Sequence, residues 1–186
     1  MLPESPVLLL LDLQRAVDHP SWGPRNNPAA EANVARLLTA WRQRHLPIVH
    51  VRHDSIEPAS TFRPGQIGND FKPEAAPLEG EQVIVKQTNS AFIGTPLEPL
   101  LRSRGYAALV VVGVTTSNAV EATVRMAGNL GFQAYVVEDG CFAFGKLDWS
   151  GRPRTAQEVH DMSLANLNGE YCVVIDTQWV LNELGV

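Results

Sequence analysis

Short apolar runs recur along the chain and define the first elements of the expected fold. They cover residues 7–11, 48–51, 83–85, 109–112, 134–137 and 172–175. Each run is rich in leucine or β-branched residues, and turn-forming or helical sequence bounds it. Continuous apolar runs of this length are typical of strands that are buried on both faces of a parallel sheet. The pattern therefore predicts a buried parallel sheet.

Stretches with helical spacing of apolar positions lie between most of these runs. They cover residues 29–44, 96–104, 118–130, 155–167 and 177–184. Gly105, Gly131 and Gly169 each precede the next apolar run, where a glycine cap would end a helix. We expect a three-layer α/β/α, Rossmann-like fold with a six-stranded parallel sheet, in the probable order 3-2-1-4-5-6.

The length of the chain fits one domain that spans residues 1–186. No internal repeat, heptad or low-complexity tract suggests a boundary within it. Residues 54–81 are rich in proline, glycine and charge and form an unusually long connection. Loops of that length usually cover a functional site.

Composition excludes several classes of partner. The net charge of −5 offers no electrostatic footprint for nucleic acid or an anionic membrane. The N-terminus lacks a signal sequence, and no apolar run is long enough to span a bilayer. Cys141 and Cys172 lie in unrelated apolar surroundings without zinc-ligand spacing, which suits a reducing compartment. We therefore expect a cytoplasmic protein.

Two charged residues stand at the carboxyl ends of predicted strands, where ligands bind in open parallel sheets. Asp12 follows the first strand and Lys86 follows the third. Taken singly, the aspartate can be a structural N-cap and the lysine can extend into solvent. Taken together, they can meet across the cleft and form a base with an adjacent cation.

A sharp turn from strand to helix begins at Gly113. The first turn of such a helix stabilises a thiolate or an oxyanion, because it presents free N–H groups and the positive end of the helix dipole. The residue that enters this helix is Ala119, which cannot attack a substrate. Spacing alone makes Ala119 part of the inward face of a buried helix.

The combination of these segments resembles the isochorismatase-like cysteine hydrolases. The resemblance rests on an aspartate after the first strand, a lysine after the third, and the pattern Gly-Val-Thr-Thr-x-x-Cys-Val-Glu-x-Thr, which here spans residues 113–123 with alanine in place of cysteine. The match continues through Ala127, Gly131 and Phe132 and through residues 137–139 and 160–167, and so extends over nearly the whole chain.

The resemblance implies a catalytic triad of Asp12 as general base, Lys86 as its support, and position 119 as the nucleophile. In the family, a cysteine attacks a carbonyl to form a thioester that water hydrolyses. A non-proline cis peptide between Val114 and Thr115 would direct the N–H groups of Thr115 and residue 119 at the oxyanion. The implied assembly is a homodimer or homotetramer, and no cofactor is expected.

Alanine at position 119 is the departure from the family pattern. We favour an introduced cysteine-to-alanine change that leaves an inactive variant, because Asp12, Lys86 and the turn are otherwise intact. A natural, non-catalytic ligand-binding protein is the alternative. Ser117 and Thr116 lie in the turn, but their hydroxyls would point elsewhere in the family geometry, so we expect local hydrogen bonding from them.

A metal site is not expected. The nicotinamidase branch of the family binds a metal through an Asp-x-His pattern, which this chain lacks. His50 and His53 lie three residues apart, on opposite faces of an extended strand. We expect His50 to be a core histidine and His53 to form a pocket wall or bind substrate.

Aromatic and polar residues near the predicted rim are candidate substrate contacts, although each can equally serve packing. The candidates are Gln14, His19, Trp22, His53, Phe62, Phe92, Phe144 and Trp149. Arg15 and Arg63 are single anchors at most, so a neutral amide, lactam or ureide is the favoured small-molecule substrate. An isochorismatase-type vinyl ether is the alternative substrate, whereas a nucleotide-binding Rossmann domain lacks the expected GxGxxG turn.

Overall fold

A computed structural model of the chain describes residues 2–186. Its main sheet contains β1 (Val7–Leu11), β2 (Ile48–His53), β3 (Gln82–Lys86), β4 (Ala108–Val114), β5 (Gln133–Phe142) and β8 (Val173–Ile175). The strand order is β3-β2-β1-β4-β5-β8, and every neighbouring pair is parallel. The predicted order is confirmed, with β8 as the sixth strand.

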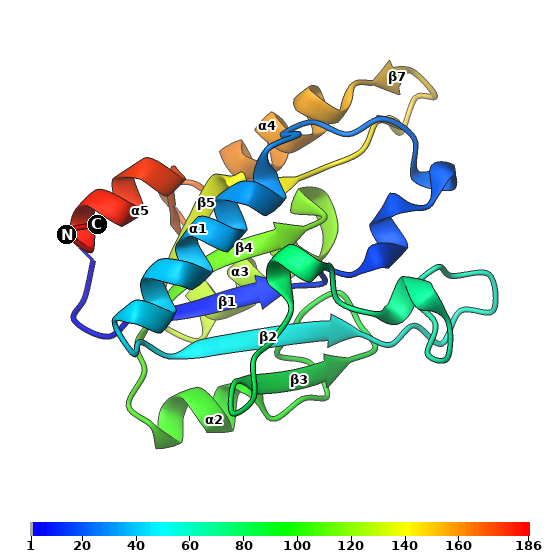
Figure 1. Ribbon diagram of the computed structural model, residues 1–186. Helices are drawn as coiled ribbons and strands as arrows, with labels where there is room; N and C mark the ends of the chain where they lie inside the picture. Colours follow the sequence, from blue (N-terminus) through cyan, green and yellow to red (C-terminus); the bar gives the residue numbers. More distant parts are fainter. Residues whose placement is uncertain (1) are drawn as a thin grey trace.

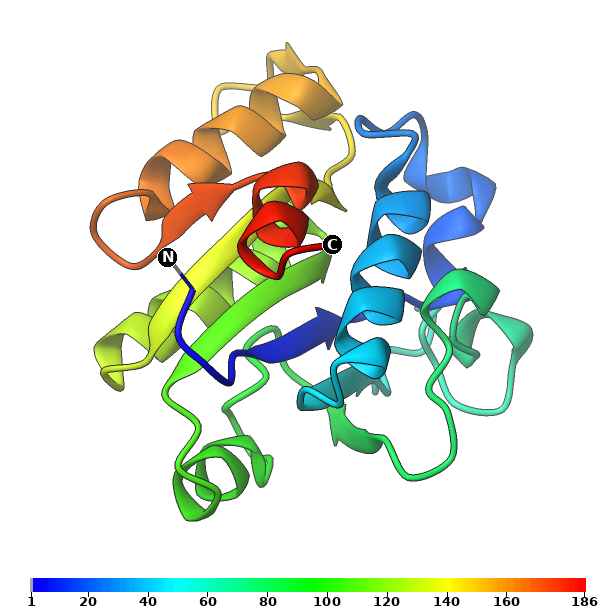
Figure 2. The same cartoon turned by 60° about the vertical axis from the view of Figure 1, so that its left-hand side comes forward.

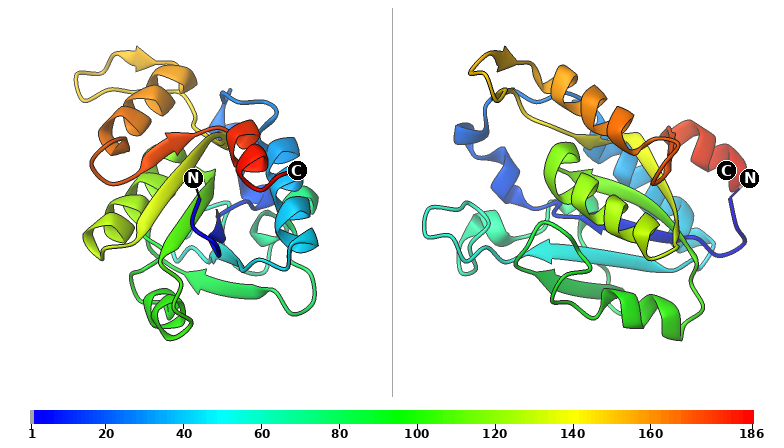
Figure 3. Two further views of the ribbon diagram at one scale, coloured as in Figure 1. Left: turned by 90° about the vertical axis from the view of Figure 1, so that its left-hand side faces the viewer. Right: turned by 180° about the vertical axis from the view of Figure 1, so that it is seen from behind.

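Helices cover both faces of the sheet, as Figure 1 and Figure 3 show. The helices are α1 (Ala30–Gln43), α2 (Leu97–Ser103), α3 (Glu121–Asn129), α4 (Ala156–Leu167) and α5 (Thr177–Glu183). Helices α1 and α5 pack on one face, and α2, α3 and α4 pack on the other. None of the helices formed by residues 2–186 combines the length and apolar character needed to cross a bilayer.

Strand β1 shows why a continuous apolar run was expected to lie inside the sheet. Its side chains alternate between the two faces, so Leu8 and Leu10 belong to the cluster under α1. Leu9 and Leu11 belong to the cluster under α3, together with Val124. Both faces of β1 are therefore buried, and the strand holds the centre of the fold.

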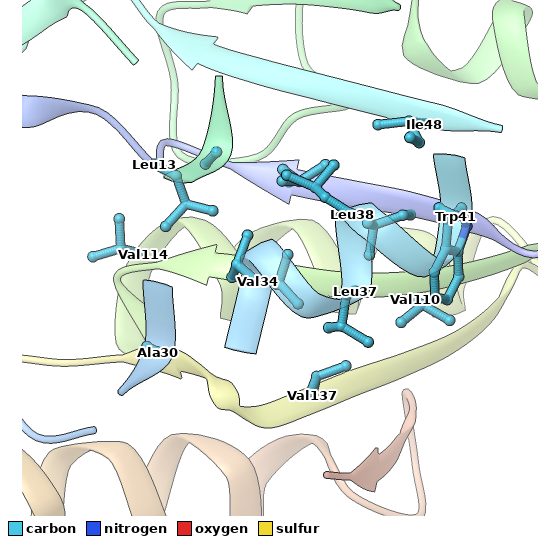
Figure 4. Packing of buried hydrophobic residues seen from close by; sticks show 14 of the residues in the cluster. Leu13, Ala30, Val34, Leu37, Leu38, Trp41, Ile48, Val110, Val114 and Val137 are labelled. Atoms are coloured by element: carbon cyan, nitrogen blue, oxygen red, sulfur yellow. The ribbon is translucent and has the colours of Figure 1, made fainter. Parts of the chain in front are cut away.

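Helix α1 packs through one apolar face, as Figure 4 shows. Val34, Leu37, Leu38 and Trp41 recur at helical spacing and are buried against the sheet. The indole N–H of Trp41 donates to the Pro6 carbonyl at 3.0 Å, so its polar atom is also satisfied. This packing fixes the sheet beneath the segments that carry the site.

Several short elements have no counterpart in the sequence prediction. Strands β6 (Lys146–Leu147) and β7 (Pro153–Arg154) form an antiparallel hairpin. Single 3-10 turns occur at Arg15–Asp18, Pro20–Trp22, Ile67–Asn69 and Pro73–Ala75. Elements of two to four residues are too short to display a hydrophobic period.

The strands all end at one edge of the sheet, where the arrowheads in Figure 1 point. Segment 12–28 and the first part of the long connection, residues 54–72, lie beyond this edge, side by side in Figure 2. An antiparallel bridge between Gln14 and Phe71 joins them. The rest of the connection runs back beside α1 to the start of β3. The first part of the long connection thus lies over the carboxyl ends of the strands, where a ligand site is expected.

Candidate active site

Asp12 occupies the turn that immediately follows β1. Its backbone adopts a left-handed φ of 53°, which is uncommon for a residue with a side chain and is best tolerated by Asp and Asn. Its N–H donates to the Val51 carbonyl at 3.0 Å, and its own carbonyl accepts from the N–H of Gln14 at 2.7 Å. These bonds hold the carboxylate at the strand end.

Lys86 crosses β2 to reach Asp12. It is the last residue of β3 and lies in register with His53 of β2, so one strand separates it from β1. Its Nζ nevertheless donates to Asp12 Oδ2 at 2.6 Å, and both side chains are buried. The expected meeting of the two groups is therefore present in the structure.

One oxygen of the Asp12 carboxylate lacks a hydrogen-bond partner among the described residues. This atom, Oδ1, is buried. Burial raises the pKa of Asp12 to about 6, although the Lys86 ammonium opposes that rise. Asp12 can therefore accept or donate a proton near neutral pH, and Oδ1 is the free atom for a ligand.

Lys86 has two further partners. Its Nζ donates to the Thr88 carbonyl at 3.0 Å and lies 3.4 Å from Nδ1 of His53. Burial, assisted by the Lys86 cation, lowers the pKa of His53 to about 4, so its imidazole is neutral at pH 7. With Nδ1 accepting from Lys86, the ring proton lies on Nε2, where His53 is a hydrogen-bond donor.

Strand β4 leads into the turn that carries residue 119. The peptide bond between Val114 and Thr115 is cis. A π-helical turn, Thr116–Val120, follows and continues into α3. The Thr115 carbonyl accepts from the N–H groups of Asn118 and Val120, which lie on either side of residue 119.

These groups surround one small cavity, which we call the inner cavity. It has a volume of about 180 Å³. Its lining consists of Asp12, Trp22, His53, Ser60, Phe62, Asn89, Val114, Thr115, Asn118 and Ala119. The structure thus brings together a carboxylate, the turn after the cis peptide and residue 119.

No other side chain supplies a nucleophile at this turn. Thr116 is fully buried and its Oγ1 lies 2.8 Å from Nδ1 of His160. Ser117 lines a separate hollow beside α4. Cys141 lies near the end of β5 and is completely buried, so it does not line the inner cavity. The methyl group of Ala119 is therefore what faces a ligand.

Comparisons with known proteins identify the family. The family model described as the isochorismatase domain matches residues 6–178. The chain belongs to the isochorismatase family. The members of this family are hydrolases, and the three-layer fold is theirs.

Two relatives cover the isochorismatase-family chain almost completely, and a third covers part of it. The isochorismatase family protein YrdC of Bacillus subtilis is 36% identical over 182 residues, which are 98% of this chain and 97% of the relative. A hydrolase of the isochorismatase family from Chromobacterium violaceum is 64% identical, with a TM-score of 0.97 and coverage of 100% and 96% of the two chains. Ureidoacrylate amidohydrolase RutB of Acinetobacter baylyi is 32% identical over 117 residues, 62% of this chain and 44% of its own.

Three of the predicted substrate contacts line the inner cavity of this isochorismatase-family protein, namely Trp22, His53 and Phe62. Phe62 meets both other rings edge-on, with centroid distances of 6.0 Å to Trp22 and 5.5 Å to His53. The three rings therefore form a continuous aromatic wall of the cavity that Ala119 also lines.

The other predicted contacts lie elsewhere. The Gln14 amide is fully buried and forms hydrogen bonds with the backbones of His53 and Asn69. It therefore fixes the backbone of His53, which lines the inner cavity, and does not contact the cavity itself. Phe92 stacks on Phe132 within the core. Phe144 packs against the back of Trp22 at a centroid distance of 5.0 Å.

Two of the predicted contacts are exposed to solvent. Trp149 is 97% exposed in the connection between β6 and β7. His19 lines a neighbouring cleft, and its Nδ1 lies 2.7 Å from the Ser21 hydroxyl. Their positions follow from a short hairpin and from single 3-10 turns, which the hydrophobic pattern does not reveal.

Three polar residues that line the inner cavity were not predicted from the sequence. Asn89 follows Lys86 by three residues, Asn118 directly precedes Ala119, and Ser60 comes from the long connection. Closeness to the predicted catalytic positions was the available signal for the two asparagines. Ser60 had no comparable signal, because its loop lacks periodicity.

His50 is a core residue, as predicted. It is fully buried, and its Nε2 lies 2.8 Å from Glu81 Oε2. No group of three or more His, Cys, Asp or Glu residues within residues 2–186 is arranged to hold a metal ion.

Proposed function

We propose that the inner cavity binds the reactive group of a small amide, lactam or ureide, and that hydrolysis of its C–N bond requires a cysteine at position 119. The observation that carries this proposal is the presence of Asp12, Thr115 and Ala119 around one cavity of about 180 Å³. The chain with alanine at this position is inactive by the thioester route. We interpret Ala119 as the replacement of a catalytic cysteine.

The proposed reaction uses the free oxygen of Asp12 twice. A cysteine at position 119 gives its thiol proton to Asp12 as sulfur attacks the carbonyl carbon. The C–N bond then breaks, and the amine leaves with that proton. Water adds to the thioester while Asp12 accepts its proton, and cleavage of the C–S bond releases the acid and returns the proton to sulfur. The N–H groups of Thr115 and residue 119 are the proposed oxyanion donors.

Relatives support the choice of bond. RutB is named as an amidohydrolase that acts on ureidoacrylate, which is a ureide. The neutral His53, together with the amides of Asn89 and Asn118, would supply hydrogen bonds to an uncharged amide.

Substitution Ala119→Cys tests this proposal. The variant is expected to hydrolyse members of an amide, lactam and ureide panel, and its thiol should react with iodoacetamide below the usual thiol pKa of about 8.5. Ser117→Cys is the matched control, because it places a thiol in the same turn but outside the inner cavity. Absence of both turnover and low-pH alkylation in Ala119→Cys would contradict the proposal.

A second candidate function needs no thiol. With its pKa near 6, Asp12 can protonate the terminal carbon of a vinyl ether. Water then adds to the resulting oxocarbenium carbon and returns a proton to Asp12, and the hemiketal separates into a ketone and an alcohol. The unmodified chain should then hydrolyse a vinyl ether and lose this activity in Asp12→Asn. Binding without turnover by either route would identify a non-catalytic ligand-binding protein.

We also propose a cytoplasmic homodimer or homotetramer, on the strength of the resemblance to the family. Light scattering coupled to size-exclusion chromatography measures the assembly. A monomer at micromolar concentration would contradict it.

A further inference from the structure

A larger cleft lies directly outside the inner cavity. This outer cleft has a volume of about 860 Å³. Its two walls are the segment 15–21 and the loop 58–74. Gly68 lines the cleft, and a Cβ atom there would lie 2.2 Å from the Thr61 carbonyl oxygen of the same loop and 3.3 Å from Cα of Ala16 in the other wall. The loop can therefore pack this closely only without a side chain at position 68.

A single layer of residues separates the outer cleft from the inner cavity. Ser60 lines both. Thr61 lines the outer cleft, whereas Trp22 and Phe62 line the inner cavity. The indole N–H of Trp22 donates to the Thr61 hydroxyl at 3.2 Å, so this hydrogen bond spans the partition.

The inner cavity is smaller than most ligand pockets. Its volume of about 180 Å³ lies below the roughly 300 Å³ at which ligand pockets usually begin. A substrate that has its reactive amide beside Asp12 and outgrows this cavity can extend past Ser60, which lines both spaces. The outer cleft is the adjoining space that can hold the rest of it.

The outer cleft carries cationic charge that is not neutralised. Arg15 and Arg63 line it, and within residues 2–186 no carboxylate lies at salt-bridge distance from either guanidinium. Lys72 also lines the cleft but is paired with Asp18 and, at 2.9 Å, with Glu31. The two arginines come from opposite walls and so face a ligand from both sides.

Charge balance indicates a monoanion. Three cationic side chains, Arg15, Arg63 and Lys72, and two carboxylates, Asp18 and Glu74, line the outer cleft. One carboxylate on the ligand would balance the surplus, whereas a phosphate, with a charge of about −1.5 to −2 at pH 7, would exceed it. Guanidinium groups also match a carboxylate through paired hydrogen bonds.

We propose that the outer cleft binds a carboxylate at the far end of the substrate, which would make the substrate a small amide or ureide with a monoanionic tail. This inference rests on the proposed use of the inner cavity for the amide end. It replaces the expectation of a neutral molecule, which followed from treating Arg15 and Arg63 as separate anchors.

Calorimetric titration of the unmodified chain tests the inference with a matched pair of ureides. N-carbamoyl-β-alanine carries a carboxylate, and propylurea carries a methyl group at the same position. We expect N-carbamoyl-β-alanine to bind about tenfold more tightly at low salt, and this preference should fall about threefold or more in Arg15→Gln and in Arg63→Gln. Arg104→Gln removes an exposed positive charge that lines a different hollow and should leave the preference unchanged.

Each outcome bears on a different proposal. Equal binding of the two ureides, binding of neither, or a preference that survives in the Arg15→Gln/Arg63→Gln double variant would overturn the carboxylate site. A preference that depends on both arginines, combined with no turnover by Ala119→Cys, would keep the carboxylate site and refute amide hydrolysis. Turnover of propylurea and N-carbamoyl-β-alanine at equal kcat/KM would keep amide hydrolysis and refute the carboxylate site.

Discussion

Lys86 Nζ lies 2.6 Å from Asp12 Oδ2, while Oδ1 of the same carboxylate is buried without a partner. An unsatisfied buried acceptor costs about 1–3 kcal/mol. The pair therefore combines a fixed cation with a carboxylate oxygen that a ligand or a reacting proton can satisfy. The chemistry proposed for the inner cavity depends on this relationship.

Turnover by Ala119→Cys should depend on pH through Asp12. The carboxylate must be ionised to accept the thiol proton, and its pKa is raised to about 6. We therefore expect kcat/KM to rise with pH and to level off above about 6.5, with about a tenfold loss at pH 5. Adding Asp12→Asn should lower kcat/KM by a factor of about 10² to 10⁴ and abolish its rise between pH 5 and 6.5. A flat profile between pH 5 and 7 would contradict the role of Asp12.

Lys86→Met should destabilise the fold strongly. The substitution leaves the Asp12 carboxylate buried without its cation, and breaking a buried pair costs about 3–5 kcal/mol. Urea unfolding at pH 7 measures the loss. The Lys86→Met/Asp12→Asn double variant should recover about half of it or more, and Lys146→Met, at an exposed position in β6, should change the free energy of unfolding by less than about 0.5 kcal/mol.

Glu31 should contribute a pH-dependent part of the stability. Burial favours a higher pKa, but the bonds from Arg25 and Lys72 outweigh it and hold the pKa at about 2. The folded pKa is depressed, so the contribution is present above the unfolded value of 4.5 and is lost as the pH falls through about 2. We expect Glu31→Gln to lose on the order of 2 kcal/mol at pH 7 and to match the unmodified chain near pH 2.

Unfolding of Glu31→Gln is best compared with Glu98→Gln, whose carboxylate pairs with Arg102 on the exposed side of α2. That exposed pair should contribute less than about 1 kcal/mol at any pH. Equal losses of the free energy of unfolding in the two variants at pH 7 would show that the bonds of Glu31 stabilise the fold no more than an exposed ion pair does.

Thr116→Val should weaken the turn below residue 119. Its hydroxyl is the partner of buried His160 Nδ1 at 2.8 Å, and the substitution leaves that nitrogen unsatisfied. We expect a loss of about 1–3 kcal/mol in thermal or urea unfolding. Thr39→Val, on an exposed part of α1, is the matched control and should lie within about 0.5 kcal/mol of the unmodified chain. Equal stability of both variants would contradict the importance of this bond.

Trp149→Ser should affect neither stability nor ureide binding. The indole is 97% exposed and does not line the inner cavity. The free energy of unfolding should stay within about 0.5 kcal/mol, and the dissociation constant of N-carbamoyl-β-alanine within about twofold. A large loss of ligand binding would contradict this expectation and support the original prediction that Trp149 contacts the substrate.

The sheet and its charged strand ends were accessible from sequence because buried parallel strands have a simple pattern. Asp12 and Lys86 each follow such a strand, and the carboxyl ends of parallel strands meet at one edge. The reach of Lys86 across β2 was not accessible, because it depends on the conformation of one long side chain between neighbouring strands.

The ligand-facing walls were harder to predict because aromatic residues look alike in a sequence. Phe62 and Phe92 both lie in segments after strands, yet Phe62 lines the inner cavity and Phe92 stacks in the core. Arg15 and Arg63 meet at one cleft only because short 3-10 turns and an aperiodic loop fold toward each other. No hydrophobic period encodes that approach.

Gly113 sets a limit on how this protein can be re-engineered. A Cβ atom there would lie 2.2 Å from the carbonyl oxygen of Leu11, so any side chain would push β4 away from β1. The displacement would move both Asp12 and Thr115, because Asp12 directly follows β1 and Thr115 directly follows β4. A library that seeks new ligand preferences should therefore keep this glycine constant and vary Asn89 and Asn118, whose backbones are not wedged between strands.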